Sequence, residues 1–420
     1  AFVAVADDAT AASWNPGGLP QLERPELSLV LSHTNFDEDF HSGSHPELSG
    51  NNGADFSNIN YFSFVYPIRH TIGGRNLVLS INYQRKFDFD RELDGIFEEG
   101  VRISPGLRTE RTYSLDYSQD GSLSALSPAF GMEITDRLSA GVVWNIWNQS
   151  IISNNEWENT VTWDPYLVSI NGIDTAGQPF TVKKQYDDFE GMNFTLGLLF
   201  KPTERLSLGL VYHSELDADV KFSRSNGERA KQDYTFPWAI GLGVAYRFPN
   251  DKLTLSMDIT RREWDDFEID TRYTAGARAG TRADVSGISG LRPGLIDIDP
   301  TYTIRLGAEY VFVNDKKPKQ NYLPSLRGGI FYDPEPSGGR SDTVAIDPVT
   351  GDAFLDGDGN VDNFYGIALG AGVLIKNRVN LDFAYTYRWG DNARTDTFTL
   401  ADTDADVKQH AFYLSTVIYF

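Results

Sequence analysis

The stretch LDGDGNVDN, late in the chain, carries oxygen donors at every second position. Asp356, Asp358, Asn360 and Asp362 repeat the donor spacing of the first half of a Ca²⁺-binding loop, where carboxylate and amide oxygens hold the ion. The twelfth position of such a loop would be Ile367 instead of a bidentate Glu, and no flanking helices are predicted, so the stretch is not an EF-hand. Two interpretations stay open: a loop that a structural Ca²⁺ stabilises, or a solvated acidic turn.

Two arginines in strand-like segments, Arg305 and Arg327, are predicted to lie on the polar side of their strands. A guanidinium can hold a carboxylate with two parallel hydrogen bonds, so each arginine is a candidate for binding the head group of an amphiphile. The alternative is an ion-pair network with the other charges on that side. These charges are Arg247, Asp258, Glu309, Asp382 and Arg388.

Three aromatic residues, Phe97, Trp157 and Trp163, lie in long connections rich in acidic residues. An exposed apolar cluster of this kind suits the docking of a hydrophobic molecule. The same side chains could instead pack one connection against another, and the sequence favours neither interpretation.

Motifs for catalysis are lacking in the sequence. With six His and no Cys, the chain contains no HExxH motif, no GxSxG motif and no Gly-rich phosphate loop followed by Lys. A Ser–His pair assembled by the fold would leave no local signature. We therefore predict a protein that is not an enzyme and that uses no cofactor apart from the Ca²⁺ considered above.

The charge balance is acidic, with 37 Lys and Arg against 59 Asp and Glu and a net charge of −22. Binding to nucleic acid needs clusters of Lys and Arg that neutralise phosphates, so no nucleic-acid partner is predicted. The lack of Cys excludes a disulfide framework and thiolate metal sites. The longest apolar runs, such as YGIALGAGVLI, fall short of the roughly 18 to 20 residues that a membrane-spanning helix needs.

The segments that must position these residues have a period of two. In FPWAIGLGVAYRF, Phe236, Trp238 and Ile240 begin an apolar row, and the positions between them are small or polar. Successive side chains of a strand point to opposite faces, so this pattern predicts strands with one apolar face. The predicted strands are 25–35, 58–68, 75–87, 110–135, 137–151, 188–201, 205–220, 235–248, 252–266, 301–313, 324–333, 362–375, 378–390 and 407–420.

Connections between these segments alternate between short and long, which is typical of a transmembrane β-barrel. The terminal segment AFYLSTVIYF ends on Phe420, and aromatic residues stand at many strand ends, as an interfacial girdle would. We therefore predict an all-β fold, a transmembrane antiparallel β-barrel of about 14 strands in the outer membrane of a Gram-negative bacterium. A soluble propeller or sandwich is the alternative, although no blade-length repeat is found. The long connections, predicted as outer loops, are 36–57, 88–109, 152–187, 221–234, 267–300, 334–361 and 391–406.

Glycines are frequent on the predicted inward face. They leave room for a ligand or a plug in the lumen, or they only allow the wall to bend, and the two interpretations carry equal weight. The glycines concerned are Gly197, Gly209, Gly241, Gly243, Gly307, Gly366, Gly370 and Gly372.

The first part of the chain shows no strand pattern. It contains ADDATAASWNPGGL, with two acids, a run of small residues, one Trp and Asn-Pro-Gly-Gly. An even number of strands puts the start of the first strand on the periplasmic side, so this segment lies at that mouth or folds into the lumen. We predict a hatch over residues 1–24 and a barrel over 25–420, with a simple turn into the first strand as the alternative.

The stretch AFVAVADDATAASWNPGGL resembles the N-terminal hatch of the FadL family, outer-membrane transporters of long-chain fatty acids and other hydrophobic compounds. Asn15 and Pro16 fall on the Asn-Pro-Ala motif of that family, whereas Gly17 replaces its Ala and is expected to add backbone freedom. Family chains commonly carry more residues before this stretch, so the sequence is expected to begin inside the hatch. The resemblance implies these hatch and gating residues: Asp7, Asp8, Trp14, Asn15, Pro16, Gly17 and Gly18.

The resemblance also implies passive transport of a hydrophobic small molecule, such as a fatty acid, a hydrocarbon, a lipid or a detergent. The molecule would dock on the outer loops, occupy a luminal site, rearrange the hatch and leave sideways into the lipids of the outer membrane. A second hypothesis is an interaction protein of a secretion system or surface assembly, which binds a protein partner through the outer loops. A third is a general porin for polar solutes, which would need an open lumen.

Overall fold

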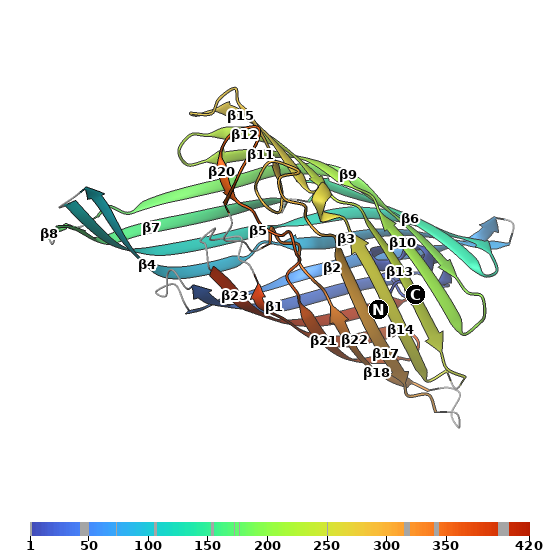
Figure 1. Ribbon diagram of the computed structural model, residues 1–420. Helices are drawn as coiled ribbons and strands as arrows, with labels where there is room; N and C mark the ends of the chain where they lie inside the picture. Colours follow the sequence, from blue (N-terminus) through green and yellow to red (C-terminus); the bar gives the residue numbers. More distant parts are fainter. Residues whose placement is uncertain are drawn as a thin grey trace.

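The chain forms one closed antiparallel β-barrel in the computed structural model (Figure 1). β1 pairs with β2 on one side and with the last strand, β23, on the other, so the wall has no free edge along its circumference. The structure describes residues 2–42, 50–72, 74–104, 107–152, 155–171, 173–175, 177–249, 251–314, 320–339, 344–393 and 403–420.

Fourteen strands make the wall, which confirms the predicted fold class. They are β1 (Glu26–Ser42), β2 (Gly50–Ile72), β3 (Arg75–Asp88), β5 (Leu107–Thr135), β6 (Leu138–Asn148), β9 (Phe180–Phe200), β10 (Leu206–His213), β13 (Ala239–Arg247), β14 (Leu253–Arg262), β17 (Thr301–Val311), β18 (Tyr322–Tyr332), β21 (Tyr365–Ile375), β22 (Val379–Ala393) and β23 (Thr403–Tyr419).

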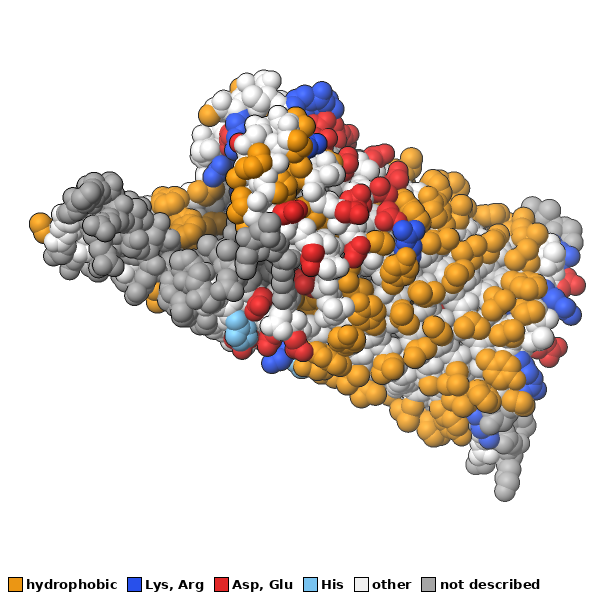
Figure 2. Space-filling model, in the orientation of Figure 1, with side chains coloured by type: hydrophobic (Ala, Val, Ile, Leu, Met, Phe, Trp, Pro, Cys, Tyr) orange, Lys and Arg blue, Asp and Glu red, His pale blue; other side chains and the backbone are white. Residues whose placement is uncertain are grey.

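The alternation read from the sequence separates a lipid face from a luminal face. On β17, Tyr302, Leu306 and Tyr310 are 44%, 43% and 40% exposed, and Arg305 and Glu309 lie between them on the luminal side. Hydrophobic side chains cover the barrel wall in rows, and charged side chains gather toward its two ends (Figure 2). An apolar belt between charged rims is what a bilayer requires of a barrel.

The long connections were expected to be loops, and the structure shows that most of them contain further strands. The sheet continues beyond the belt, and β4, β5 and β7 extend far past the barrel (Figure 1). Outside lipid both faces of a strand can be polar, so the hydrogen-bond ladder continues without the alternation that would reveal it. The added strands are β4 (Arg91–Ser104), β7 (Glu156–Ile170), β8 (Ile173–Thr175), β11 (Leu216–Arg224), β12 (Arg229–Phe236), β15 (Glu268–Ala275), β16 (Arg282–Ser286), β19 (Val344–Ile346) and β20 (Ala353–Leu355).

Helical structure in the described chain is short. The N-terminal segment, residues 2–24, holds α1 (Ala11–Trp14) and the 3-10 turn η1 (Pro16–Gln21), and a second 3-10 turn, η3, spans Trp264–Asp266. Within the described residues, no helix has the length and apolar character to cross a membrane.

We predict that Leu326→Arg destabilises the inserted barrel. Leu326 lies near the middle of β18, faces lipid and is 52% exposed, so an arginine there would meet hydrocarbon at a cost of about 2–4 kcal/mol. The free energy of unfolding from lipid vesicles measures the effect. Val349→Arg, in the turn between β19 and β20, is the control and should leave that free energy unchanged, because Val349 is 73% exposed outside the belt. Equal losses in both variants would contradict the assigned lipid face.

Candidate functional site in the barrel lumen

The N-terminal segment lies inside the barrel, and Asn15 is its central connection. The Asn15 side chain is fully buried, and its Nδ2 donates to the Val3 carbonyl at 2.7 Å and to the Leu198 carbonyl of β9 at 3.0 Å. Its Oδ1 accepts from the Gly17 backbone N–H at 2.9 Å, which starts η1. One amide therefore joins two regions of the segment to each other and to the wall.

Gly17 and Gly18 are required by close packing. A Cβ on Gly17 would lie 2.8 Å from the Leu198 backbone, and one on Gly18 would lie 2.1 Å from the Ala6 carbonyl oxygen. Neither glycine has a positive φ, so backbone freedom is not the reason for either. The expectation that Gly17 adds mobility is therefore replaced by a steric explanation, because alanine would not fit against β9.

Glycines on one side of the wall make room for the N-terminal segment. A Cβ on Gly141 of β6 would lie 2.1 Å from the Pro16 carbonyl oxygen, and one on Gly209 of β10 would lie 2.2 Å from that of Val3. On the other side of the lumen, Gly370 has no atom closer than 3.4 Å to such a Cβ. The glycines of β6 and β10 therefore accommodate the plug.

Two further contacts fix the segment to the wall. The Asp258 carboxylate of β14 accepts from the backbone N–H groups of Phe2 and Val3, the latter at 3.1 Å. The Tyr61 hydroxyl of β2 donates to the Ala9 carbonyl at 2.8 Å. Small side chains between these points pack against the wall, so the segment closes one half of the lumen.

The other half of the lumen holds a cavity of about 600 Å³, which we call the lower cavity. It lies between the N-terminal segment and strands β17, β18 and β22. Five residues singled out from the sequence meet at it: Asp7, Asp8, Trp14, Arg305 and Arg327. The structure thus brings together predicted hatch residues and predicted ligand residues that lie about 300 positions apart.

Ion pairs occupy both of these arginines, which confirms the predicted luminal network. Arg327 contacts Glu309 at 2.8 Å and Asp382 at 2.5 Å, and Arg305 contacts Asp333 at 3.7 Å. The Arg305 guanidinium also lies 5.9 Å from the ring centre of Trp14, at cation–π distance. Head-group binding by Arg305 or Arg327 stays a prediction, since a ligand carboxylate would have to compete with these partners.

The two acids of the N-terminal segment face this network. Enclosure in the lumen raises the pKa of Asp7 to about 6, the negative charges of Asp8 and Glu309 add to the increase, and Arg247 opposes it. Enclosure also raises the pKa of Asp8, while hydrogen bonds from Thr10 act in the other direction. Near neutral pH, the segment is therefore docked with charges that the lumen does not favour.

A second space of about 480 Å³, the upper cavity, lies toward the end of the barrel that carries the long hairpins. Its lining includes Lys86, whose side chain is exposed to it, and five phenylalanines. The phenylalanines are Phe36, Phe56, Phe87, Phe89 and Phe364. Four carboxylates, Glu38, Asp88, Asp90 and Glu335, also line it, and Arg91, Arg85 and Arg388 form ion pairs with them. The space is therefore aromatic and carries charges of both signs, and among the described residues Lys86 is a lining cation without a carboxylate in an ion pair with it.

Lys86 is a candidate site residue that was not predicted from the sequence. It lies on β3, nearly opposite Arg262 of β14, and the two positive charges are close enough to repel each other. Arg262 donates to the Pro237 carbonyl at 3.4 Å and stacks over Trp264 at 5.5 Å. Within the described chain, no carboxylate forms an ion pair with either cation. The break in alternation at QRKFDFD, where the apolar row turns charged, was the available signal.

The predicted aromatic docking residues lie on the hairpins beyond the belt. Trp157 stacks on Tyr186 at 4.5 Å and belongs to a cluster that continues down to Phe87 and Phe236. Trp163 stacks on a neighbouring phenylalanine farther along the same hairpin. Phe97 is on β4, and its side chain lies outside the described residues.

The wall between β2 and β3 is interrupted below the hairpins. The hydrogen-bond ladder of β2 and β3 begins at the short turn between them and ends at the pair Tyr61–Gln84. Directly beyond it, Asn60 is skipped in the β1–β2 register and Lys86 in the β3–β5 register, so each edge carries a bulge. Bulges bend and twist strands, and here they separate the neighbouring strands beside the upper cavity.

The acidic stretch predicted for Ca²⁺ does not converge on one point. Asp358 accepts a hydrogen bond from the Asn360 amide at 2.6 Å, and Asp362 forms a backbone bridge with Glu335. Asp356 is exposed. In the part of the chain that the structure describes, no three His, Cys, Asp or Glu side chains are grouped to share a metal ion. As placed, these donors do not fit a Ca²⁺ site, and the ion stays an untested prediction.

We predict that Gly141→Ala loosens the plug, because its Cβ would collide with Pro16. The matched variant Gly370→Ala adds the same methyl group where the nearest atom is 3.4 Å away, and it should behave as wild type. Single-channel conductance in planar bilayers measures the difference, since a displaced plug opens the lumen to ions. Equal conductance of Gly141→Ala and Gly370→Ala would contradict the proposed fit of plug to wall.

We predict that acidification strengthens docking of the N-terminal segment. The docked state raises the pKa of Asp7 from its ordinary value of 3.8 to about 6, so the docked state binds the proton more tightly than a segment released into water. Docking should therefore strengthen as the pH falls through about 6 and weaken above it. A spin label on a Ser13→Cys variant reports mobility of the segment between pH 7.5 and 5. An unchanged pH profile in the Asp7→Asn variant would contradict the assignment of the pH dependence to Asp7.

The family described as outer membrane protein transport protein (OMPP1/FadL/TodX) matches residues 100–417. The N-terminal segment lies outside this range. No curated protein matches the chain by sequence.

Solved structures of similar shape include a Pseudomonas aeruginosa FadL homologue, with a TM-score of 0.61, 15% identity, and coverage of 100% of this chain and 96% of that one. The Pseudomonas putida toluene transporter TodX has a TM-score of 0.54 at 13% identity and covers 98% and 93%. The Ralstonia pickettii toluene transporter TbuX has a TM-score of 0.50 at 15% identity and covers 98% and 94%. These likenesses show the fold, and the family match covers most of the sequence. The chain therefore belongs to the FadL/TodX family, the Gram-negative outer-membrane β-barrels that transport hydrophobic compounds.

Proposed function

We propose that this protein carries amphiphiles with an anionic head group, of the long-chain fatty acid class, across the outer membrane. The observation that supports this substrate class is Lys86, an exposed cation in an aromatic cavity for which the described chain provides no carboxylate partner. A ligand carboxylate would supply the missing charge, and the phenylalanines would contact its hydrocarbon chain.

A neutral hydrocarbon suits this cavity less well. The related structures named above include toluene transporters, and toluene carries no charge. An apolar ligand beside Lys86 would displace water from an ammonium group without replacing its hydrogen bonds, which costs free energy. The cavity therefore favours a charged amphiphile over toluene.

The proposed route follows the apolar surfaces. The ligand docks on the aromatic cluster around Trp157, moves to the upper cavity, and leaves through the interrupted wall between β2 and β3. Exit into lipid avoids returning the hydrocarbon chain to water, which would cost about 0.8 kcal/mol for each CH₂. The N-terminal segment acts as the hatch that closes the straight path to the periplasm. The concentration gradient of the ligand across the outer membrane alone drives this transport. The proposal includes no covalent step and no cofactor.

A protein partner at the hairpins is the second candidate function. The observation that favours it is the sheet of β4, β5 and β7, which reaches far beyond the barrel (Figure 1). A ligand route needs no such extension. Removal of the end of this sheet should spare fatty-acid uptake if the two functions are separate.

We predict that Lys86→Gln weakens handling of fatty acids and spares toluene. Loss of a charge-assisted hydrogen bond worth about 1.5–3 kcal/mol would raise the half-saturating concentration of the acid about tenfold or more. Uptake of labelled fatty acid and of labelled toluene is measured in cells that lack their own transporters. Lys231→Gln is the matched control, because this exposed lysine of β12 carries the same charge outside the lumen.

Two outcomes would contradict the assignment. One is unchanged uptake of the fatty acid by Lys86→Gln, and the other is an equal decrease for toluene. Either would show that Lys86 does not recognise a carboxylate.

A further inference from the structure

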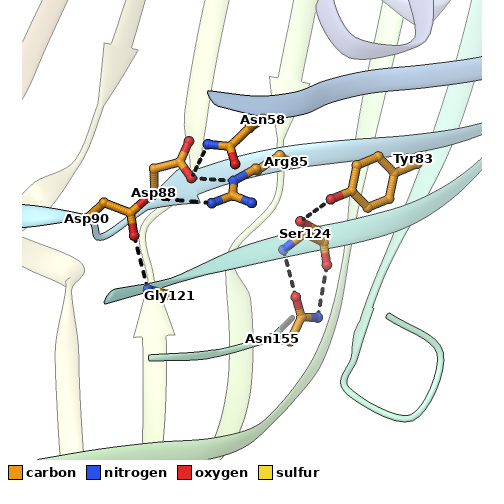
Figure 3. Close-up of polar contacts among 8 residues, drawn as sticks. All are labelled: Asn58, Tyr83, Arg85, Asp88, Asp90, Gly121, Ser124 and Asn155. Atoms are coloured by element: carbon orange, nitrogen blue, oxygen red, sulfur yellow. Dashed lines mark hydrogen bonds and ion pairs between the residues drawn. The ribbon is translucent and has the colours of Figure 1, made fainter. Parts of the chain in front are cut away.

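Among the described residues, a hydrogen bond between two side chains crosses the interruption between β2 and β3 close to its lower border. Beyond the last ladder pair, Tyr61–Gln84, the Asn58 Nδ2 of β2 donates to the Asp88 Oδ1 of β3 at 3.2 Å. This hydrogen bond is seen in Figure 3, where the two side chains point toward each other from their strands. We call it the gate contact.

We propose that the gate contact is the barrier of the lateral exit, and that ligand passes when Asn58 and Asp88 separate. This inference rests on the proposed function, because it assigns a gate to the exit named there. Beyond the proposed function, the inference names the residues that hold the exit closed and explains why they can separate.

The surrounding ladder explains why a polar side-chain contact stands here. Strand edges in a membrane cannot leave backbone N–H and C=O groups unpaired, because hydrocarbon offers no hydrogen bonds in exchange. The bulges at Asn60 and Lys86 lie in the β1–β2 and β3–β5 ladders, next to the point where the β2–β3 ladder ends, and they bend the two edges apart. Asn58 and Asp88 close the separation with side chains, which can move apart without the loss of a whole ladder.

The charge of Asp88 remains compensated when the gate contact opens. Arg85 of the same strand donates to Asp88 through its Nε, and its Nη2 lies 3.9 Å from Asp90 (Figure 3). Separation from Asn58 would therefore cost one hydrogen bond, and Asp88 would keep its ion pair with Arg85. A neutral amide opposite an already paired acid makes a contact of modest strength, as a gate requires.

The β3 side of the gate is held in place by the neighbouring strand. Asp90 accepts from the Gly121 backbone N–H of β5 at 3.3 Å, and the Gly121 carbonyl accepts from Phe89 at 3.0 Å. Gly121 has a φ of 132° and no space for a Cβ, so β5 bends at this level. On the other side of Gly121, the Asn155 side-chain amide accepts from the Ser124 backbone N–H and donates to the Ser124 carbonyl (Figure 3). The backbone groups next to the bend therefore have hydrogen-bond partners. The mobile partner is therefore expected to be Asn58, on β2.

Apolar residues lie on both sides of the gate contact. Phe87, next to Asp88, lines the upper cavity. Ile59, next to Asn58, faces outward and is 52% exposed. Opening the contact would connect an aromatic space inside to an aliphatic surface in lipid.

A cysteine pair can test the gate because the chain contains no Cys of its own. The variant Asn58→Cys/Asp88→Cys is bridged in cells with a short cross-linker that a reductant cleaves. The control is Phe64→Cys/Ile81→Cys, a facing pair in the intact β2–β3 ladder. Bridging Asn58→Cys/Asp88→Cys should lower uptake of labelled fatty acid to the level of cells without the protein, and cleavage should restore it. The control pair should transport equally with and without the bridge.

A second variant separates a gate from a merely structural contact. Asn58→Ala removes the gate contact and leaves the Arg85–Asp88 pair, so its uptake should equal or exceed that of wild type. Reduced uptake by a correctly folded Asn58→Ala barrel, checked by its heat-modifiable mobility in gels, would overturn the proposal. Unimpaired uptake through the bridged Asn58→Cys/Asp88→Cys pair would also overturn it and would leave the proposed function standing. Failure of wild type to take up the acid would overturn both.

Discussion

Inside a bilayer, every backbone N–H and C=O group must find its hydrogen-bond partner within the protein. The wall meets this constraint by closing β1 onto β23, and the alternation of the strands then decides which side chains meet lipid and which meet the lumen. The interruption of the β2–β3 ladder matters for the same reason, because backbone groups beyond its last pair lose their partners on the neighbouring strand. The β2–β3 ladder ends there beside bulges in the two adjoining ladders, and a hydrogen bond between the Asn58 and Asp88 side chains crosses the separation.

The lumen that this closure creates is filled unequally. On the side of β6, β9 and β10, glycines admit the N-terminal segment so closely that added methyl groups would collide with it. On the side of β17, β18 and β22, larger polar side chains of nearby strands pair with each other along the wall of an open cavity. The plug is thus held by shape on one face, while its acids and Trp14 face the cavity on the other.

Charge pairing separates structural residues from candidates for ligand binding. Arg305 and Arg327 are held by carboxylates of neighbouring strands and serve the wall. Lys86 faces an aromatic cavity with another cation, Arg262, as its electrostatic neighbour. A buried or enclosed charge that its own protein does not neutralise is the stronger indication of a ligand, because leaving it unpaired costs stability.

The barrel can be predicted from the amino-acid pattern, because the period of two is imposed locally by the pleat and by lipid on one side of each strand. The sequence also indicated the plug and the luminal ion pairs, since Asn15-Pro16 and the inward charges can be read from single segments. It did not reveal the hairpin strands, the steric need for Gly17, or the site around Lys86. Those depend on residues far apart in the chain: Gly17 packs against Leu198, Arg262 acts on Lys86 through its charge, and Asn58 donates a hydrogen bond to Asp88. Only closure of the wall brings such residues together, so these features could not be predicted from single segments of the chain.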